Sequence, residues 1–210
     1  MKNKFGLLCA IPIAALLTLA SSKTTHADPI LIDYGVVEGG IRFIDLLPNT
    51  PNQVVQLFAS GIADEGGVNG FELDIQIGDG GEDLGGSDVG PVFASVDLET
   101  GTVWDESSTQ DDVQVFPLAR QSTIEGPSLL NTDGLIGSFT IDTTGFAGTE
   151  LEFRMTGVAD VFDSTFFRGG DPISTTAPNG RIRISAVPEP GSLALLAFAP
   201  LWMLRRRRVS

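Results

Sequence analysis

The chain has 210 residues, of which 42% are hydrophobic, and it carries a formal net charge of -14 with a sequence pI of about 4.2. The charge is uneven, because residues 28–189 hold all 27 Asp and Glu against six arginines and no lysine. So negative a field repels nucleic acid and anionic membrane surfaces, which excludes a nucleic-acid-binding protein and favours solubility and cation binding.

Residues 1–27 have the order of a secretory signal peptide, which we expect to be helical. Two lysines are followed by an apolar run over 5–20 and then by a polar stretch that ends at Ala27. We predict cleavage between Ala27 and Asp28, with a cut after Ala20 as the alternative. A transmembrane anchor is the competing interpretation, but the apolar run is short for a span.

Several residue types that serve enzymes are missing after this segment. The histidine, the cysteine and the three lysines of the chain all lie within residues 1–27. Their loss with the signal peptide excludes a Ser-His-Asp triad, a thiol nucleophile, a Schiff-base lysine and a His-ligated zinc site. A carboxylate pair, as in glycoside hydrolases, is the remaining enzymatic alternative. We therefore expect a protein that is not an enzyme.

Apolar and polar residues alternate through the middle of the chain, as in strands that cover a core with one face. The alternation is clear at 71–77, 138–142, 151–156 and 181–185, and further strands are expected at 31–37, 54–59, 92–98, 113–118 and 158–162. Turn residues that can supply positive φ are Asn69-Gly70, Asp79-Gly80-Gly81, Asp133-Gly134 and Asn179-Gly180. We predict an all-β domain over residues 28–186, an antiparallel two-sheet sandwich or jelly roll.

Acidic residues are concentrated in one glycine-rich segment of this domain. Asp79, Glu82, Asp83 and Asp88 place hard oxygen ligands on a single loop, and calcium prefers such donors. Their spacing differs from that of an EF-hand. Calcium is therefore a candidate cofactor with these four residues as its ligands, and a solvated acidic loop is the alternative.

Trp104 is the residue best suited to stack on a sugar ring. In a strand, Val103 and Trp104 would point to opposite faces, so Trp104 either lies in the core or forms a lone platform. Tyr34 is the only tyrosine of the chain. A strong polysaccharide-binding face is therefore not indicated.

The C-terminal segment, residues 187–210, has the order of a membrane stop-transfer signal. Fourteen mostly apolar residues, 191–204, are followed directly by an arginine cluster. The apolar run is shorter than the roughly 20 residues of a full span, yet such a cluster holds a tail on the cytoplasmic side. We predict a short transmembrane helix, with a buried core helix as the alternative. The stop-transfer residues are Arg205, Arg206, Arg207 and Arg208.

The same segment resembles the PEP-CTERM sorting signal. That signal consists of a Pro-Glu-Pro motif, a short apolar helix and a terminal arginine cluster, and here the motif is Val187, Pro188, Glu189 and Pro190. The resemblance covers the last 24 residues. It implies processing near the motif by an exosortase, a transpeptidase-like membrane enzyme of bacteria that make an extracellular polysaccharide matrix.

The order of strands in the middle is similar to that of a cohesin-type domain. The segments that carry the likeness are 53–59, 68–77, 135–142 and 179–184, within a stretch of about residues 40–185. The resemblance implies a β-sandwich, and no partner-binding residue is carried over from it.

These observations predict an exported envelope protein with a structural or adhesive role. The tail would hold it in the inner membrane until an exosortase processes it, after which it would reach the cell surface or extracellular matrix. Exopolysaccharide or matrix proteins are the expected partners. The alternative is a module that binds carbohydrate or protein with the help of calcium, and a carboxylate-based glycoside hydrolase is the distant one.

Overall fold

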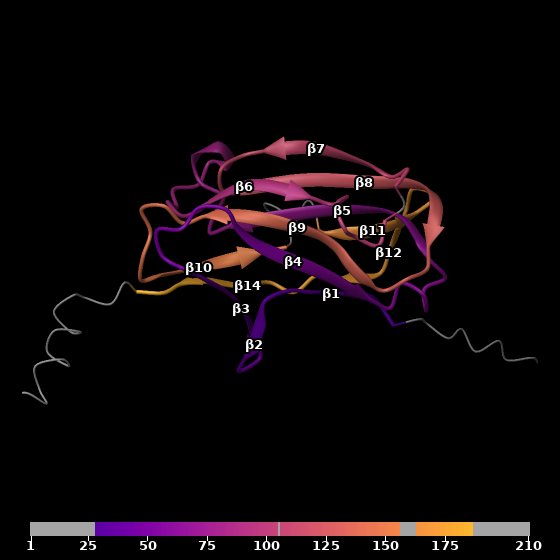
Figure 1. Cartoon of the computed structure of the whole chain (residues 1–210), viewed down its shortest axis with the longest axis horizontal. Helices are drawn as coiled ribbons and strands as arrows, with labels where there is room; N and C mark the ends of the chain where they lie inside the picture. Colours follow the sequence, from indigo (N-terminus) through magenta and orange to yellow (C-terminus); the bar gives the residue numbers. More distant parts are fainter. Residues whose placement is uncertain (1–27, 105, 156–162, 187–210) are drawn as a thin grey trace, which may run out of the picture.

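The computed structural model describes residues 28–104, 106–155 and 163–186. Across these ranges the chain is built almost wholly of β-strands that form two sheets (Figure 1). The first sheet, sheet A, has the strand order β13 (Thr175–Thr176), β1 (Ile30–Asp33), β4 (Gln53–Ser60), β9 (Gly134–Asp142) and β6 (Val92–Asp97).

The second sheet, sheet B, is larger. Its strand order is β12 (Asp171–Ile173), β11 (Thr165–Arg168), β5 (Val68–Ile77), β10 (Thr149–Arg154), β14 (Gly180–Ile184), β3 (Ile41–Leu46) and β2 (Val36–Glu38). β8 (Ala119–Leu130) pairs with β5, and β7 (Thr109–Val115) pairs with β8. The predicted two-sheet β-sandwich is confirmed. Two of its strand pairs, β1 with β13 and β3 with β14, are parallel rather than antiparallel.

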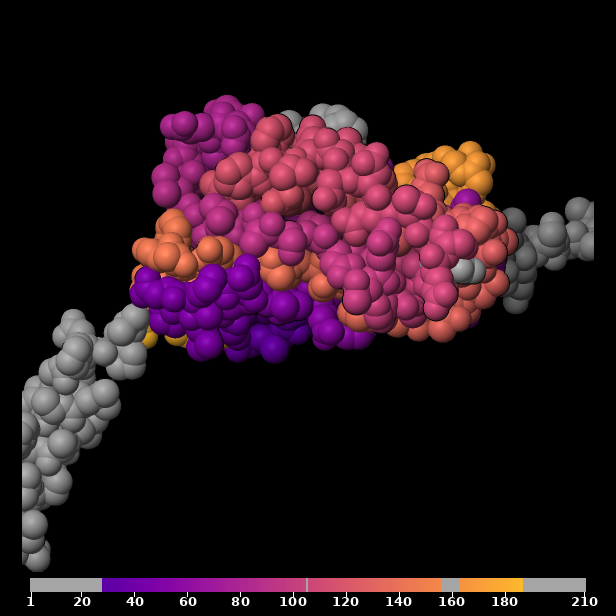
Figure 2. Space-filling model, turned by 45° about the horizontal axis from the view of Figure 1, so that its top comes forward, coloured from indigo at the N-terminus to yellow at the C-terminus, as the bar shows by residue number. Residues whose placement is uncertain are grey.

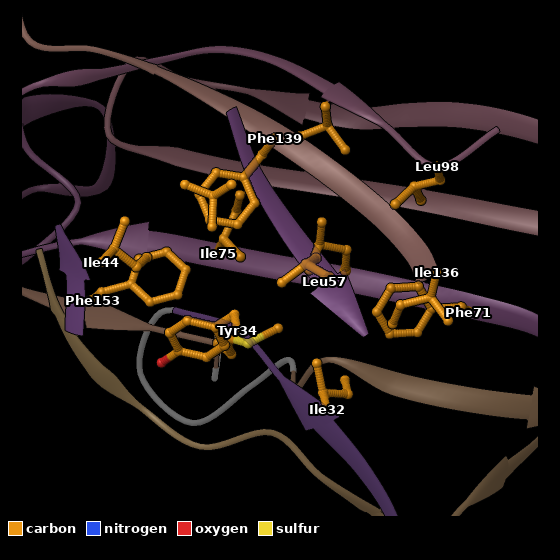
Figure 3. Packing of buried hydrophobic residues seen from close by; sticks show 14 of the residues in the cluster. Ile32, Tyr34, Ile44, Leu57, Phe71, Ile75, Leu98, Ile136, Phe139 and Phe153 are labelled. Atoms are coloured by element: carbon orange, nitrogen blue, oxygen red, sulfur yellow. The ribbon is translucent and has the colours of Figure 1, made fainter. Parts of the chain in front are cut away.

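The core lies between the sheets and is made by the alternation that the sequence shows. In β5 the side chains of Phe71, Leu73, Ile75 and Ile77 are at most 2% exposed, because every second residue of the strand points inward. Aromatic rings fill the centre of the sandwich (Figure 3). Phe153 lies there with its ring centroid 5.1 Å from Tyr34 and 5.5 Å from Phe139.

The structure corrects several local predictions. Asn69-Gly70 does not form a turn, because both residues lie inside β5, where the pairing with β8 is irregular between Val68 and Gly70. Gly180 begins β14 without a positive φ. The turn at Asp79-Gly80-Gly81 is confirmed, with φ of 84° at Gly80 and 73° at Gly81.

Some strands differ from those predicted. The stretch expected at 31–37 is two strands, β1 and β2, in different sheets, and only 113–115 of the stretch expected at 113–118 lies in β7. Five strands were not predicted: β3, β8, β11, β12 and β13. The strand expected at 158–162 lies outside the described residues.

The described chain begins and ends at opposite ends of the sandwich (Figure 1). Asp28 precedes β1, whose Ile30 donates to the carbonyl of Ser174, and Ala186 follows β14 beside Gly148. Ala27, the sorting motif Val187–Pro190 and the arginines 205–208 lie outside the described residues. No helix within the described ranges is long and apolar enough to cross a membrane.

Candidate binding surfaces

The acidic loop predicted to hold calcium is closed by its own hydrogen bonds. Both carboxylate oxygens of Asp79 accept backbone N–H groups, from Gly81 at 3.0 Å, Ser87 at 2.6 Å and Asp88 at 2.9 Å. Asp88 Oδ2 in turn accepts the Asp79 N–H at 2.9 Å. These backbone donors hold the pKa of Asp79 below its usual range. The loop geometry is therefore explained without a bound ion.

The other two predicted ligands lie on the short 3-10 helix η1 (Glu82–Leu84), between Asp79 and Asp88. Across the ranges that the structure describes, no three or more Asp, Glu, His or Cys side chains are grouped so that they could hold a metal ion. Calcium binding at Asp79, Glu82, Asp83 and Asp88 stays a prediction of the sequence.

Trp104 belongs to the core and not to a sugar-binding platform. Its side chain is 8% exposed, and the indole Nε1–H donates to the carbonyl of Ile136 at 3.0 Å. Its ring stacks on Phe166 with the centroids 6.4 Å apart. A buried ring with a satisfied donor cannot offer a face to a sugar, so the first of the two predictions for Trp104, that it lies in the core, is confirmed.

Polar side chains are buried on the outer face of β5, opposite the core. Asp74 is 5% exposed and Gln76 is 2% exposed, and one acceptor atom of each, Asp74 Oδ2 and Gln76 Oε1, has no hydrogen-bond partner. Neighbouring Glu72 accepts the amide N–H of Gln121, across the ladder on β8, at 2.6 Å. Buried polar atoms without partners are rare in native proteins, and each one costs stability.

Burial first, and then the charges of Glu72 and Asp163, together raise the pKa of Asp74 to about 7. Glu72 is the charged group that contributes most to this shift, and both carboxyl groups lie on the same face of β5, two residues apart.

A groove of about 390 Å³ opens at the far end of the same face. Its floor is Gly70, and its walls include Phe167 of β11 and Thr123 of β8. Glu72 and Glu125 supply carboxylates, and the lining contains no Lys or Arg. Arg168, the next residue after Phe167, donates to the carbonyls of Gly67 and Glu65 instead. We call this feature the Gly70 groove.

A second groove, of about 410 Å³, opens along the side of the sandwich between β4 and β3. Exposed apolar side chains of Val36, Val54 and Phe58 line it, above the buried Ile44 and Val55. In Figure 2 the first strands, which contribute this lining, lie together in indigo along one edge of the molecule. We call this feature the seam groove.

Neither groove was predicted from the sequence. The Gly70 groove depends on β8 and β11, which lack clear alternation and were not recognised as strands. The seam groove depends on where β1 leaves sheet A, which is a property of tertiary structure. The one available signal was that Val54 and Phe58, two apolar residues, fall on the outward face of the strand at 53–60.

Comparison with known proteins places the fold and nothing finer. No protein-family model matches the chain, and no curated protein matches it. Among solved structures it is similar to the third ScaC cohesin of Acetivibrio cellulolyticus, solved in complex with the ScaB dockerin. That likeness has a TM-score of 0.51 and 12% identity and covers 75% of this chain and 99% of that one.

A type I cohesin–dockerin complex from Clostridium thermocellum matches with a TM-score of 0.52 and 13% identity, over 77% of this chain and 97% of that one. A non-cellulosomal cohesin from the archaeon Archaeoglobus fulgidus matches with a TM-score of 0.50 and 14% identity, over 80% and 97%. At such low identities the likeness concerns the fold alone. The described part of the chain is a cohesin-like β-sandwich.

Proposed function

We propose that this chain is an exported, exosortase-sorted envelope protein whose sandwich is a non-catalytic module that binds another protein. The observation that carries the binding role is the likeness to cohesins over nearly their whole length. Two of those cohesins were solved with a dockerin partner. A sandwich with the same layers offers this chain the same kind of broad sheet surface.

Export and sorting are supported by the two ends of the sequence. The signal-peptide order of residues 1–27 and the Pro-Glu-Pro, apolar and arginine order of residues 187–210 flank the domain. Because Asp28 and Ala186 lie at opposite ends of the sandwich, a tail held in the membrane would turn the Asp28 end outward. The Gly70 groove lies toward that outer end, beside the Gly67 and Gly169 loops.

A non-catalytic role is supported by the chemistry of the domain. Residues 28–186 contain no His, Cys or Lys, and Asp74, the carboxyl group with the raised pKa, is buried on a sheet face. The cleft and the separated acid and base that hydrolysis needs do not coincide there. The domain would therefore act by binding, among the matrix proteins or exopolysaccharide outside the cell.

The Gly70 groove is the surface on which we place the partner. The aliphatic part of a lysine or arginine side chain from the partner protein would pack along Phe167, which brings its charge close to Glu72 and Glu125. Gly70 leaves the floor open, since a Cβ there would lie 3.7 Å from both Phe167 Cβ and Glu125 Cγ.

Cross-linking in the native host tests this role. The full-length chain is expressed with a photo-reactive amino acid at Thr123, and cross-linked proteins are identified by mass spectrometry. We expect one partner that is lost on Gly70→Val, which fills the groove, and weakened on Phe167→Ala. Val113→Lys, an exposed change on β7, should leave it intact. A cross-linking pattern that Gly70→Val does not alter would refute the assignment to this groove.

A further inference from the structure

Two strands of the sandwich have a free edge on the same side of the molecule. β4 pairs with β9 over Gln53–Ala59, but it pairs with β1 only over Phe58–Ser60. Within the described residues, no strand lies on the β1 side of Val54–Gln56. In the same way, β2 pairs with β3 only over Ile41–Phe43, so Ile44–Leu46 has no strand on its β2 side.

The cause is the path of the chain between β1 and β2. After Asp33 the chain leaves sheet A, crosses the side of the sandwich at Tyr34 and Gly35, and joins sheet B as β2. Gly35 has a φ of 59° and approaches β3 so closely that a Cβ would lie 2.2 Å from the Phe43 carbonyl oxygen. The crossing therefore closes one end of the space between the two sheets, and beyond it the edges of β4 and β3 have no neighbouring strand within the described residues.

The seam groove lies between these two edges. Its other end is closed by the β3–β4 connection, where the Gln53 side chain bonds to the backbone N–H and carbonyl of Leu47 at 2.7 and 3.0 Å. Each free edge is about three residues long, which corresponds to about 10 Å of extended chain. Unpaired edge backbone beside an apolar groove is what strand addition requires: ladder hydrogen bonds on one side and pockets for alternate side chains on the other.

The side chains around the groove indicate what could enter it. Val54 is 63% exposed, Val36 47% and Phe58 44%, so an apolar side chain gains contacts from three directions. Asp33 and Asp45 line the groove, and no Lys or Arg does. Nearby, Arg42 pairs with Asp33, while Arg183 is shared between Asp45 and Glu38, so carboxylates outnumber guanidinium groups. A cationic chain would be attracted and an acidic one repelled.

We infer that the seam groove is a docking site for an extended segment of a partner protein, with alternating apolar residues and basic residues at its ends. The segment pairs with the free edge of β4 at Val54–Gln56, where it continues the position that β1 occupies beside Phe58–Ser60 in sheet A. A second copy of this acidic domain is a poor occupant, because 27 acids against six arginines over residues 28–189 oppose self-association.

This inference rests on the proposed role as a protein-binding module, but it concerns another surface than the Gly70 groove. Hydrogen exchange read by mass spectrometry on the full-length chain in detergent tests it. The probe is a short peptide of alternating valine and threonine with a lysine at each end. We expect exchange at 53–58 and 43–47 to slow at least tenfold at saturation, with no change in β5 or β8.

Matched variants make the assignment specific. Val54→Lys and Phe58→Lys, both at exposed positions, should weaken peptide binding at least tenfold, whereas Val113→Lys, 53% exposed on β7, should not. The same peptide with glutamate ends should bind at least tenfold more weakly. Circular dichroism melting confirms that the variants are folded.

Three outcomes would overturn the inference. The first is no saturable protection, or protection that survives Val54→Lys. The second is protection of 53–58 that rises with protein concentration alone, which would make a second copy the occupant. The third is protection without peptide that disappears when residues 187–210 are deleted, which would make the chain's own tail the occupant. These exchange readouts do not depend on whether Gly70→Val removes the partner that is cross-linked at the Gly70 groove. Each of the two proposals can therefore fail without the other.

Discussion

Arg183 in β14 binds both carboxylate oxygens of Asp45 in β3, through Nε at 2.6 Å and Nη2 at 3.0 Å, although the residues are 138 positions apart. Its guanidinium also lies 4.6 Å from the ring centroid of Phe43 and donates to Glu38. The bonds to the Asp45 and Glu38 carboxylates raise the pKa of Arg183. They tie β14 to β3 and to the β2 edge that borders the seam groove.

Replacing Arg183 should therefore loosen the parallel pair at the sheet edge. We expect Arg183→Ala to lower the melting temperature by about 2–4 °C, because the bidentate pair and the cation–π contact are lost together. Arg183→Lys should give a smaller drop. Arg181→Ala, which removes an exposed pair with Glu150, is the control and should have little effect. Equal drops for Arg181→Ala and Arg183→Ala would contradict a special role for this contact.

The close approach of Gly35 to β3, which closes one end of the seam groove, can be tested by substitution. Gly35 and Gly39 have almost the same φ, 59° and 58°, but a Cβ at Gly39 would meet nothing within 4 Å. Gly39→Ala should cost about 1 kcal/mol for the left-handed backbone alone. Gly35→Ala should cost about 3 kcal/mol or more, because its Cβ collides with the Phe43 carbonyl. Urea unfolding measures both, and equal costs would show that the crossing is looser than described.

Asp74 gives the domain a distinctive pH dependence. Its pKa in the folded state is about 7, above the ordinary aspartate value of 3.8, so between these pH values the folded state keeps a proton that the unfolded state has released. The free energy of unfolding should therefore fall as pH rises from about 4 to about 7 and then level off. Asp74→Asn should flatten this dependence and stabilise the domain at pH 8 by on the order of 2–4 kcal/mol.

The controls for Asp74 are its acidic neighbours. Glu72→Gln should stabilise in the same direction but less, since it removes one source of the raised pKa and leaves the burial. Asp163→Asn should have a smaller effect still. Chemical unfolding between pH 4 and pH 8 provides the measurement. A wild-type stability that rises with pH over this range, with Asp74→Asn no different, would refute the account.

Substitution of two phenylalanines, one in the core and one in the groove lining, should have very different effects on stability. Phe153 is fully buried between Tyr34 and Phe139, so Phe153→Ala should cost about 3–5 kcal/mol. Phe58 is 44% exposed beside the seam groove, and Phe58→Ala should cost less than about 1 kcal/mol. Urea unfolding compares them. Similar losses would mean that Phe58 supports the fold and is not free to receive a ligand.

The fold class could be predicted because β4, β5, β9 and β14 show their buried faces directly in the sequence. β8 could not, since its inward positions include Arg120 and Ser122, which bond to Phe93 and Ala94 carbonyls and to Asp112. Polar residues satisfied by a neighbouring strand break the alternation on which strand prediction depends. Because β8 was not predicted, the side of the Gly70 groove that β8 forms could not be predicted either.

The binding surfaces also depend on long-range topology that no local pattern encodes. Leu31 to Val37 looks like one strand, and only the close approach of Gly35 to β3 shows that it divides between two sheets. Asp79, one of the predicted calcium ligands, also closes its own loop by accepting backbone N–H groups, which residue type alone does not reveal. Residue type indicates what a side chain can bind, and the fold decides what it does bind.

Intact mass spectrometry of the protein from its native host, separated into membrane and extracellular pools, would distinguish a sorted and cleaved protein from a tail-anchored one. We expect a released form that begins at Asp28 and ends near Pro188 to Pro190, and that is lost when both prolines are replaced by alanine. A mass that retains Arg205–Arg208 in every pool would contradict sorting by an exosortase and would leave a protein anchored by its own tail.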